Sequence, residues 1–135
     1  MGKVDYSLGV RVRSDSTMTY RLIYVGKLPR VNRQSPSYWL RYGLQQRCLK
    51  QFGILPQRQT HRARVAVTRV LGPRERLMDE WENLRVAFKG GIDALVKGGY
   101  LVDDSPKWVS FNEPRQDTTR RHQGPRIEIT ITYEN

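Results

Sequence analysis

Two groups of carboxylates flank a stretch of helical periodicity in the second half of the chain. Asp79, Glu80 and Glu82 stand at its start, and Asp103 and Asp104 follow its end. Carboxylate oxygens are the ligands that Mg²⁺ prefers, and a metal between carboxylates and a phosphate can polarise the phosphoryl oxygen and activate an attacking water. The two groups would share a metal if the loop after the helix returned to the helix start, or if a second subunit supplied one of them. By spacing alone, all five of these acids are candidate metal ligands.

The same acids also have a purely structural explanation. Acidic residues in the first turn of a helix are stabilised by the helix dipole, and an Asp-Asp pair is common in turns. His61 and His122 lack a Cys or His partner at metal-ligand spacing, so the sequence does not predict a zinc site. Spacing alone therefore leaves both the metal site and the structural explanation open.

The charge distribution favours nucleic acid as the partner. The chain carries a net charge of +11 at pH 7, and such a surplus attracts polyanions. Residues 16–74 contain no acid and twelve Lys or Arg residues, whereas residues 75–104 contain seven of the thirteen acids. Clustered carboxylates oppose phosphate binding unless a cation lies between them and the phosphate. The sequence thus predicts a protein that binds nucleic acid, with DNA favoured, and that uses a divalent metal.

Composition predicts a single soluble domain. The chain has 135 residues, of which 38% are hydrophobic, and a single cysteine, Cys48. It has no apolar run of the roughly 20 residues that a membrane span needs, and no signal-peptide core in residues 1–15. We therefore expect one domain over residues 1–135, with residues 1–16 as an N-terminal extension and residues 112–126 as a mobile basic loop. We also expect a reducing, cytoplasmic location, and neither a membrane partner nor a small-molecule cofactor.

Hydrophobic periodicity predicts the elements that would position these residues. Strands are expected at residues 7–13, 17–26, 61–71, 107–111 and 126–133, and helices at residues 35–52 and 80–97. On the first helix, Leu40, Leu44 and Cys48 define the predicted buried face. On the second, Gly90-Gly91 is interpreted as a packing feature. The expected fold class is α/β (α+β), a small mixed sheet of about four strands with two main helices.

The stretch around the acids resembles the RusA-type Holliday junction resolvases of bacteria and their phages. That family shows Asp-x-Asp-Asn-Leu at a helix start, then a basic residue, Asp-Ala-Leu or Asp-Gly-Leu, a Gly, and Asp-Asp-Ser or similar. The corresponding residues are Glu80-Trp81-Glu82-Asn83-Leu84, Lys89, Asp93-Ala94-Leu95, Gly99 and Asp103-Asp104-Ser105. Residues 28–33 are also similar to the family's early Pro and Asn loop, and residues 125–129 to its closing strand.

The resemblance implies a homodimeric, RusA-like endonuclease that binds four-way DNA junctions and cuts them symmetrically with Mg²⁺. It implies that Glu80, Glu82, Asp103 and Asp104 are the metal ligands and that Lys89 stabilises the phosphate electrostatically. Glu80 and Glu82 stand where the family usually has Asp. Mn²⁺ is expected to substitute for Mg²⁺. The implied role is that of a crossover junction endodeoxyribonuclease in DNA recombination or repair, of phage or prophage type.

Scattered arginines are the predicted contacts to the DNA backbone, on the basis of charge alone. They are Arg30, Arg33, Arg62, Arg64, Arg120 and Arg121. The alternative function is that of a non-catalytic DNA- or RNA-binding protein, in which the acids only cap a helix and fill a turn.

Overall fold

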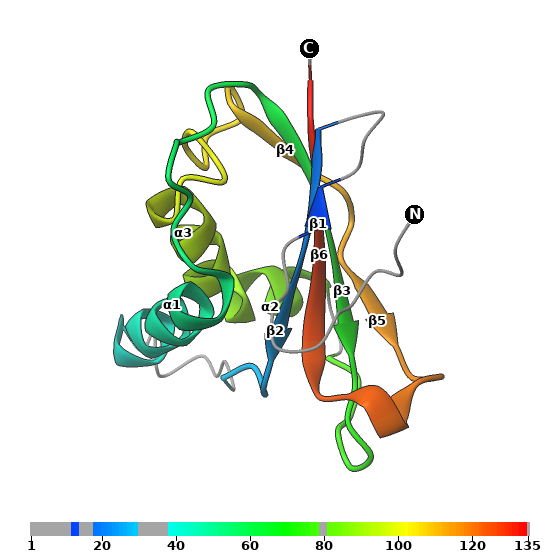
Figure 1. The fold of residues 1–135 in the computed structure, drawn as a ribbon. Helices are drawn as coiled ribbons and strands as arrows, with labels where there is room; N and C mark the ends of the chain where they lie inside the picture. Colours follow the sequence, from blue (N-terminus) through cyan, green and yellow to red (C-terminus); the bar gives the residue numbers. More distant parts are fainter. Residues whose placement is uncertain (1–11, 14–17, 30–37, 79–80, 135) are drawn as a thin grey trace.

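The protein is organised around a mixed sheet with its helices on one side (Figure 1). In the computed structural model, the described residues are 12–13, 18–29, 38–78 and 81–134, and within them the sheet has six strands. The strands are β1 (Val12–Arg13), β2 (Thr19–Val25), β3 (Ala63–Val70), β4 (Val109–Phe111), β5 (Arg115–Asp117) and β6 (Arg126–Tyr133). The helices are α1 (Tyr38–Phe52), α2 (Trp81–Ala87) and α3 (Lys89–Lys97), with a short 3-10 helix η2 at Arg121–Gln123. None of these helices has the length and apolar character needed to cross a bilayer.

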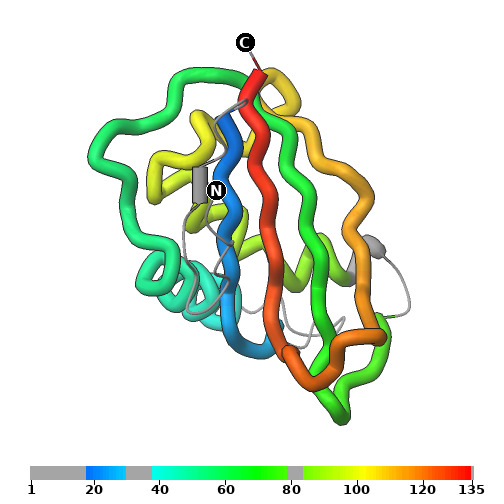
Figure 2. Tube along the Cα trace, turned by 45° about the vertical axis from the view of Figure 1, so that its right-hand side comes forward, coloured from blue at the N-terminus to red at the C-terminus, as the bar shows by residue number. Residues whose placement is uncertain are grey.

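The last strand, β6, lies at the centre of the sheet. It is antiparallel to β2 on one side and to β3 on the other, and Figure 2 shows it running between them. β3 also has β4 and β5 as parallel neighbours along different parts of its length, and β1 is antiparallel to β2. The expected α/β class with a small mixed sheet is confirmed, and the short strands β1 and β5 extend it beyond about four strands.

Alternation along the strands separates the core face from the outer face. On β3, Ala63 and Val65 are buried, whereas Arg64 between them is exposed. On β6, Ile129 and Ile131 are buried and Thr130 between them is partly exposed. A side-chain period of two places one set of residues against the helices and the other toward the opposite side of the sheet. The strand predictions for both segments are confirmed.

The single helix expected over residues 80–97 is instead two helices, α2 and α3. Phe88 lies between them with φ −93° and ψ 5°, outside the helical region, and the chain changes direction there (Figure 1). Glycine has a low helix propensity, so Gly90 and Gly91 weaken a continuous helix at this point. The Phe88 ring lies only 2.3 Å from the position of a Cβ atom built on Gly91. The missing side chain at Gly91 therefore makes room for the buried Phe88 ring.

Gly90 allows α3 to pack directly on the backbone of α1. A Cβ atom built on Gly90 would lie 2.3 Å from the carbonyl oxygen of Arg41 and 3.1 Å from the amide nitrogen of Gln45. Both distances are shorter than a van der Waals contact, so only glycine fits without a shift of one helix. The packing role predicted for Gly90-Gly91 is confirmed.

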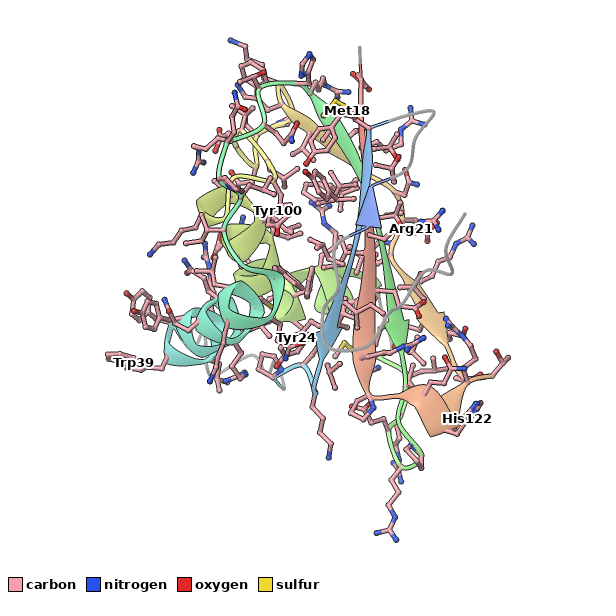
Figure 3. The ribbon with its side chains drawn as sticks, in the orientation of Figure 1. Met18, Arg21, Tyr24, Trp39, Tyr100 and His122 are labelled. Atoms are coloured by element: carbon pink, nitrogen blue, oxygen red, sulfur yellow. The ribbon has the colours of Figure 1, made fainter. Side chains whose placement is uncertain are left out.

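The core holds the C-terminal part of α1 but not its start. Leu44, Cys48 and Phe52 are buried. Leu40 was expected on the same buried face but is 43% exposed. The reason is that the first turns of α1 extend beyond the sheet, and Figure 3 shows Trp39 at the end of the helix that points away from it.

Residues 112–126, expected to be a mobile basic loop, contain β5 and η2. Arg69, on β3 next to β5, is buried, with only 6% of the residue exposed. Its Nη1 donates to Gln116 Oε1 at 2.8 Å and to the carbonyl oxygen of Arg76 at 3.1 Å, and its Nη2 lies 3.3 Å from Glu75 Oε2. A short polar strand such as β5 has no hydrophobic alternation, and therefore no strand signal in its sequence.

Gly98 and Gly99 end α3 as predicted. Gly99 has φ +87°, in the left-handed region that glycine adopts at low cost. The amides of Tyr100 and Leu101 then both donate to the carbonyl oxygen of Leu95. Tyr100 is fully buried, so the chain after α3 is anchored in the core before it reaches the Asp-Asp pair.

Candidate functional site

Lys89 and Asp104 meet beside the start of α3, although 15 positions separate them in the sequence. The Lys89 ammonium donates a hydrogen bond to Asp104 Oδ2. This bond holds the pKa of the Asp104 carboxyl below its usual value, and the positive charge of Lys89 and a contact with Asp103 act in the same direction. Asp104 is therefore ionised at neutral pH, as a carboxylate must be to bind a metal.

Further ion pairs connect Lys89 to α1. Lys89 Nζ lies 3.9 Å from Asp93 Oδ1. Arg41 donates to both oxygens of Asp93, from Nε to Oδ2 at 2.6 Å and from Nη2 to Oδ1 at 3.1 Å. The hydrogen bond to Asp93 raises the pKa of Arg41. Arg41, Asp93, Lys89 and Asp104 form what we call the ion-pair network, which joins α1, α3 and the loop after α3.

The other candidate ligands are placed only in part. Asp103 is exposed beside Asp104 in the loop after α3. Glu82 lies in the first turn of α2, and its side chain falls outside the described part of the chain, as does the whole of Glu80. The structure thus brings Lys89, at the start of α3, together with Asp104, in the loop that returns after α3. It does not test whether the acids of α2 join them.

A small cavity adjoins the Lys89–Asp104 pair, between α2, α3 and the strands β3 and β4. Its volume is about 100 Å³, and Lys89 and Asp104 contribute to its lining. Most of its wall is apolar and consists of Val67, Leu84, Phe88, Ile92, Phe111 and Pro114. Arg85 lies over the Phe111 ring, 5.9 Å from its centroid. An apolar wall lowers the local dielectric constant, so charges beside it interact more strongly than in water.

The sequence did not predict this cavity or the role of Arg41. The lining residues come from separate elements that approach one another only in the folded chain. Arg41 and Asp93 are 52 positions apart, so no local spacing connects them. The sequence contains one indication of the Arg41 contact. No acid lies near Arg41 in the sequence, so any acidic partner must be far from it along the chain.

The carboxylates of the loop fit a magnesium site by their chemistry. Mg²⁺ is commonly held by one or two carboxylates, with water and substrate phosphate completing its ligands. Asp103 and Asp104 supply hard oxygens on adjacent residues, and the lowered pKa of Asp104 keeps it ionised. Among the described residues, no group of three His, Cys, Asp or Glu side chains converges on one point. A third protein ligand would therefore come from an acid outside the described side chains, such as Glu80 or Glu82, or from a second subunit.

Comparison with known proteins assigns this site to no family. No family model matches the chain, and no curated protein matches it. The candidate site is therefore defined by the contacts of its own residues.

Two of the predicted DNA contacts, Arg62 just before β3 and Arg64 on it, lie where β3 pairs with β4. Arg64 is exposed. Arg62 donates from Nη1 to Glu134 Oε1 at 2.8 Å and from Nη2 to the carbonyl oxygen of Pro106 at 3.3 Å. Both groups are accessible to a phosphate, since the Arg62 side chain is 37% exposed despite its ion pair. Two further predicted contacts, Arg30 and Arg33, lie outside the described residues.

Arg120 instead makes several contacts within the protein. It donates to Asp117 Oδ2 from Nε at 2.9 Å, and to both oxygens of Glu128 at 2.8 and 2.9 Å. Hydrogen bonds from Thr119 and then Arg120 lower the pKa of Asp117 to about 2. Burial raises the pKa of Glu128, but the hydrogen bond from Arg120 and the nearby arginine charges lower it overall. These contacts hold the chain between β5 and β6 against the sheet.

Arg121 is used in a similar way. Its Nη1 donates to the carbonyl oxygens of Gly72 and Glu75, both at 2.7 Å. These bonds link η2 to the segment that follows β3. The proposed DNA contact at Arg121 would therefore have to be made by a guanidinium that is already bound to two carbonyl groups.

Replacing Arg120 with alanine is expected to reduce stability more than DNA affinity. The change removes the bidentate donor of the partly buried Glu128 and one hydrogen bond to Asp117. Loss of the bonds to Glu128 typically costs about 1–2 kcal/mol in the free energy of unfolding. The matched variant Arg64→Ala should change stability by less than about 0.5 kcal/mol, because Arg64 is exposed. Urea unfolding and DNA titration of both variants measure the two effects. Unchanged stability with a large loss of affinity in Arg120→Ala would instead make Arg120 a phosphate contact.

Proposed function

We propose that this protein is a Mg²⁺-dependent endonuclease that cleaves branched DNA, with the four-way junction as its substrate. The observation that supports the proposal most strongly is the meeting of Lys89 and the ionised Asp104 beside a cavity, in a chain with a net charge of +11. Basic residues attract DNA, and the carboxylates would be tolerated near phosphate with a cation between them. We place this activity in the cytoplasm, in DNA recombination or repair of phage or prophage type.

Each residue has a distinct role in the proposed site. Asp103 and Asp104 would hold Mg²⁺ together with Glu80 or Glu82, and the metal would supply Lewis-acid chemistry at the phosphate. Lys89 would stabilise the negative charge of the phosphate, which requires it to share or exchange its bond to Asp104. Asp93 offers Lys89 a second carboxylate at 3.9 Å. This neighbour holds the ammonium near the site when Asp104 binds elsewhere.

Cleavage of a synthetic four-way junction tests the proposal directly. We expect paired nicks at symmetrical positions in Mg²⁺, similar products in Mn²⁺ and no cleavage in EDTA. A linear duplex of the same sequence is the control and should be cut far more slowly. Junction binding without cleavage in either metal would favour the alternative function.

The alternative is a non-catalytic DNA- or RNA-binding protein, and one observation favours it. Asp93 and Asp104 are already paired with Arg41 and Lys89 in the ion-pair network. Such pairs can simply hold helices and loops together. In that case Lys89 would be needed for stability, and divalent metal would not change the outcome of any DNA assay.

We further propose that the protein acts as a homodimer, because symmetrical nicking of two strands needs two acidic sites. Light scattering should give a mass of about twice 15.8 kDa. The measurement should be made at micromolar protein, both free and bound to a junction. A mass near 15.8 kDa for the free protein, together with a single copy per junction in the complex, would contradict the dimer.

A further inference from the structure

Three aromatic side chains project into solvent from the first turns of α1. Tyr38 is 66% exposed, Trp39 76% and Tyr42 43%. Their rings contact one another: Tyr38 stacks on Tyr42 with centroids 6.1 Å apart and an interplanar angle of 13°, and meets Trp39 edge to face at 5.4 Å. Figure 3 shows Trp39 directed away from the rest of the molecule. We call these three residues the aromatic cluster.

The charge around the aromatic cluster indicates what it binds. α1 contains Arg41, Arg47 and Lys50 and no acidic residue. Flat aromatic faces next to basic side chains are the combination with which proteins hold single-stranded nucleic acid, because bases stack on the rings while cations attract the backbone. A second copy of this face is a poor partner, since two acid-free basic helices would repel each other. The complementary partner is a polyanion that carries exposed rings.

We infer that the aromatic cluster stacks on unpaired bases of branched DNA. The choice of DNA rests on the proposed function. The stacking itself needs only an unpaired strand and no catalysis. Base pairs at the point of strand exchange open at a lower cost than pairs inside a continuous duplex, whose bases are stacked on both sides and out of reach.

The packing of α1 on α3 places the aromatic cluster near the candidate catalytic pair. The carbonyl oxygen of Arg41, between Trp39 and Tyr42 in the sequence, is the atom that a Cβ on Gly90 would meet. Gly90 directly follows Lys89, and the Arg41 guanidinium reaches the ion-pair network through Asp93. A base stacked on the aromatic cluster would thus belong to a nucleotide close to the one whose phosphate reaches Lys89 and Asp104.

Binding of oligo(dT) and of a blunt duplex, measured in EDTA so that no strand is cut, tests this inference. Trp39→Ala should weaken oligo(dT) binding about tenfold or more and duplex binding less than about twofold. Trp39→Phe keeps an aromatic face and should retain most of the affinity. Ile54→Ala removes an apolar side chain that is 65% exposed and is the matched control, with no expected effect. Quenching of tryptophan fluorescence by oligo(dT) should be strong in the parent and largely lost in Trp39→Phe.

Three results would overturn the inference. The first is that Trp39→Ala weakens the binding of oligo(dT) and of the duplex equally. The second is that Trp39→Ala does not weaken oligo(dT) binding. The third is that Trp39→Ala has a lower native mass than the parent without DNA, which would make the aromatic cluster an interface between copies. Because Trp39 is exposed and outside the core, the variant should keep the circular dichroism of the parent. The nuclease proposal is tested separately. If the parent binds oligo(dT) through Trp39 but cuts no junction in Mg²⁺, the stacking inference stands and the nuclease proposal fails.

Discussion

Replacing Asp104 with asparagine is expected to abolish metal-dependent cleavage of a four-way junction while junction binding survives. Asparagine keeps the size of the side chain and part of its hydrogen bonding but removes the charge that would hold Mg²⁺. The cleavage rate should fall by at least about a hundredfold, equivalent to about 2.7 kcal/mol of lost transition-state stabilisation. Binding should be unchanged or slightly tighter, because the variant releases Lys89 from its ion pair and increases the net positive charge. Single-turnover cleavage and titration in EDTA measure the two quantities.

Asp93→Asn is the matched control for this change. It also removes one carboxylate from the ion-pair network. Asp93, however, is a partner of Arg41 and is not a proposed metal ligand. We expect it to reduce cleavage by about tenfold, the lower end of the loss typical of a residue that acts through another, and so by less than Asp104→Asn does. Cleavage by Asp104→Asn at the parent's rate would show that Asp104 only stabilises the loop. Equal losses in both variants would assign the effect to the ion-pair network as a whole.

Replacing Gly90 with alanine is expected to destabilise the protein, although alanine favours helix. The added Cβ would lie 2.3 Å from the carbonyl oxygen of Arg41, and a backbone atom cannot move aside as the end of a flexible side chain can. α1 and α3 must therefore separate, which we expect to cost about 1–3 kcal/mol in the free energy of unfolding. The gain in helix propensity, about 1 kcal/mol, would offset only part of this cost. Urea denaturation measures the net effect.

Gly43→Ala, on α1, is the control for helix propensity. A Cβ atom there would meet only Nη1 of Arg47, at 3.2 Å, the mobile end of a side chain. We expect this variant to be as stable as the parent or more stable by up to about 1 kcal/mol. If Gly90→Ala were stabilised to the same extent, the close approach of α1 and α3 would not be needed for the fold.

The sequence was sufficient to predict the elements whose pattern is local. Alternation at Val65 and Val67 and along β6 identifies strands with one buried face, because the side-chain period of a strand is two. Gly99 ends α3 because its left-handed backbone is a local requirement that glycine meets. The net charge of +11 is likewise a property of the sequence, and it favours a polyanion as the partner before any fold is known.

The tertiary structure decided which charged residues remain available to a ligand. Arg120 and Arg64 are equivalent in the sequence, yet Arg120 binds Asp117 and Glu128 whereas Arg64 is exposed. The meeting of Lys89 with Asp104 likewise depends on how the chain returns after α3. Long-range ion pairs depend on distances in space, and spacing along the sequence does not encode them.

The same distinction applies to the apolar residues of the helices. The pattern Leu40, Leu44, Cys48 predicts one buried face, but only the packed sheet determines where that face runs out, which leaves Leu40 exposed with the aromatic cluster beside it. Phe88 lies between α2 and α3, and its ring occupies the space that a side chain at Gly91 would need. Helical periodicity specifies which side of a helix is apolar, whereas the extent of the core beneath it depends on elements that are distant in the chain.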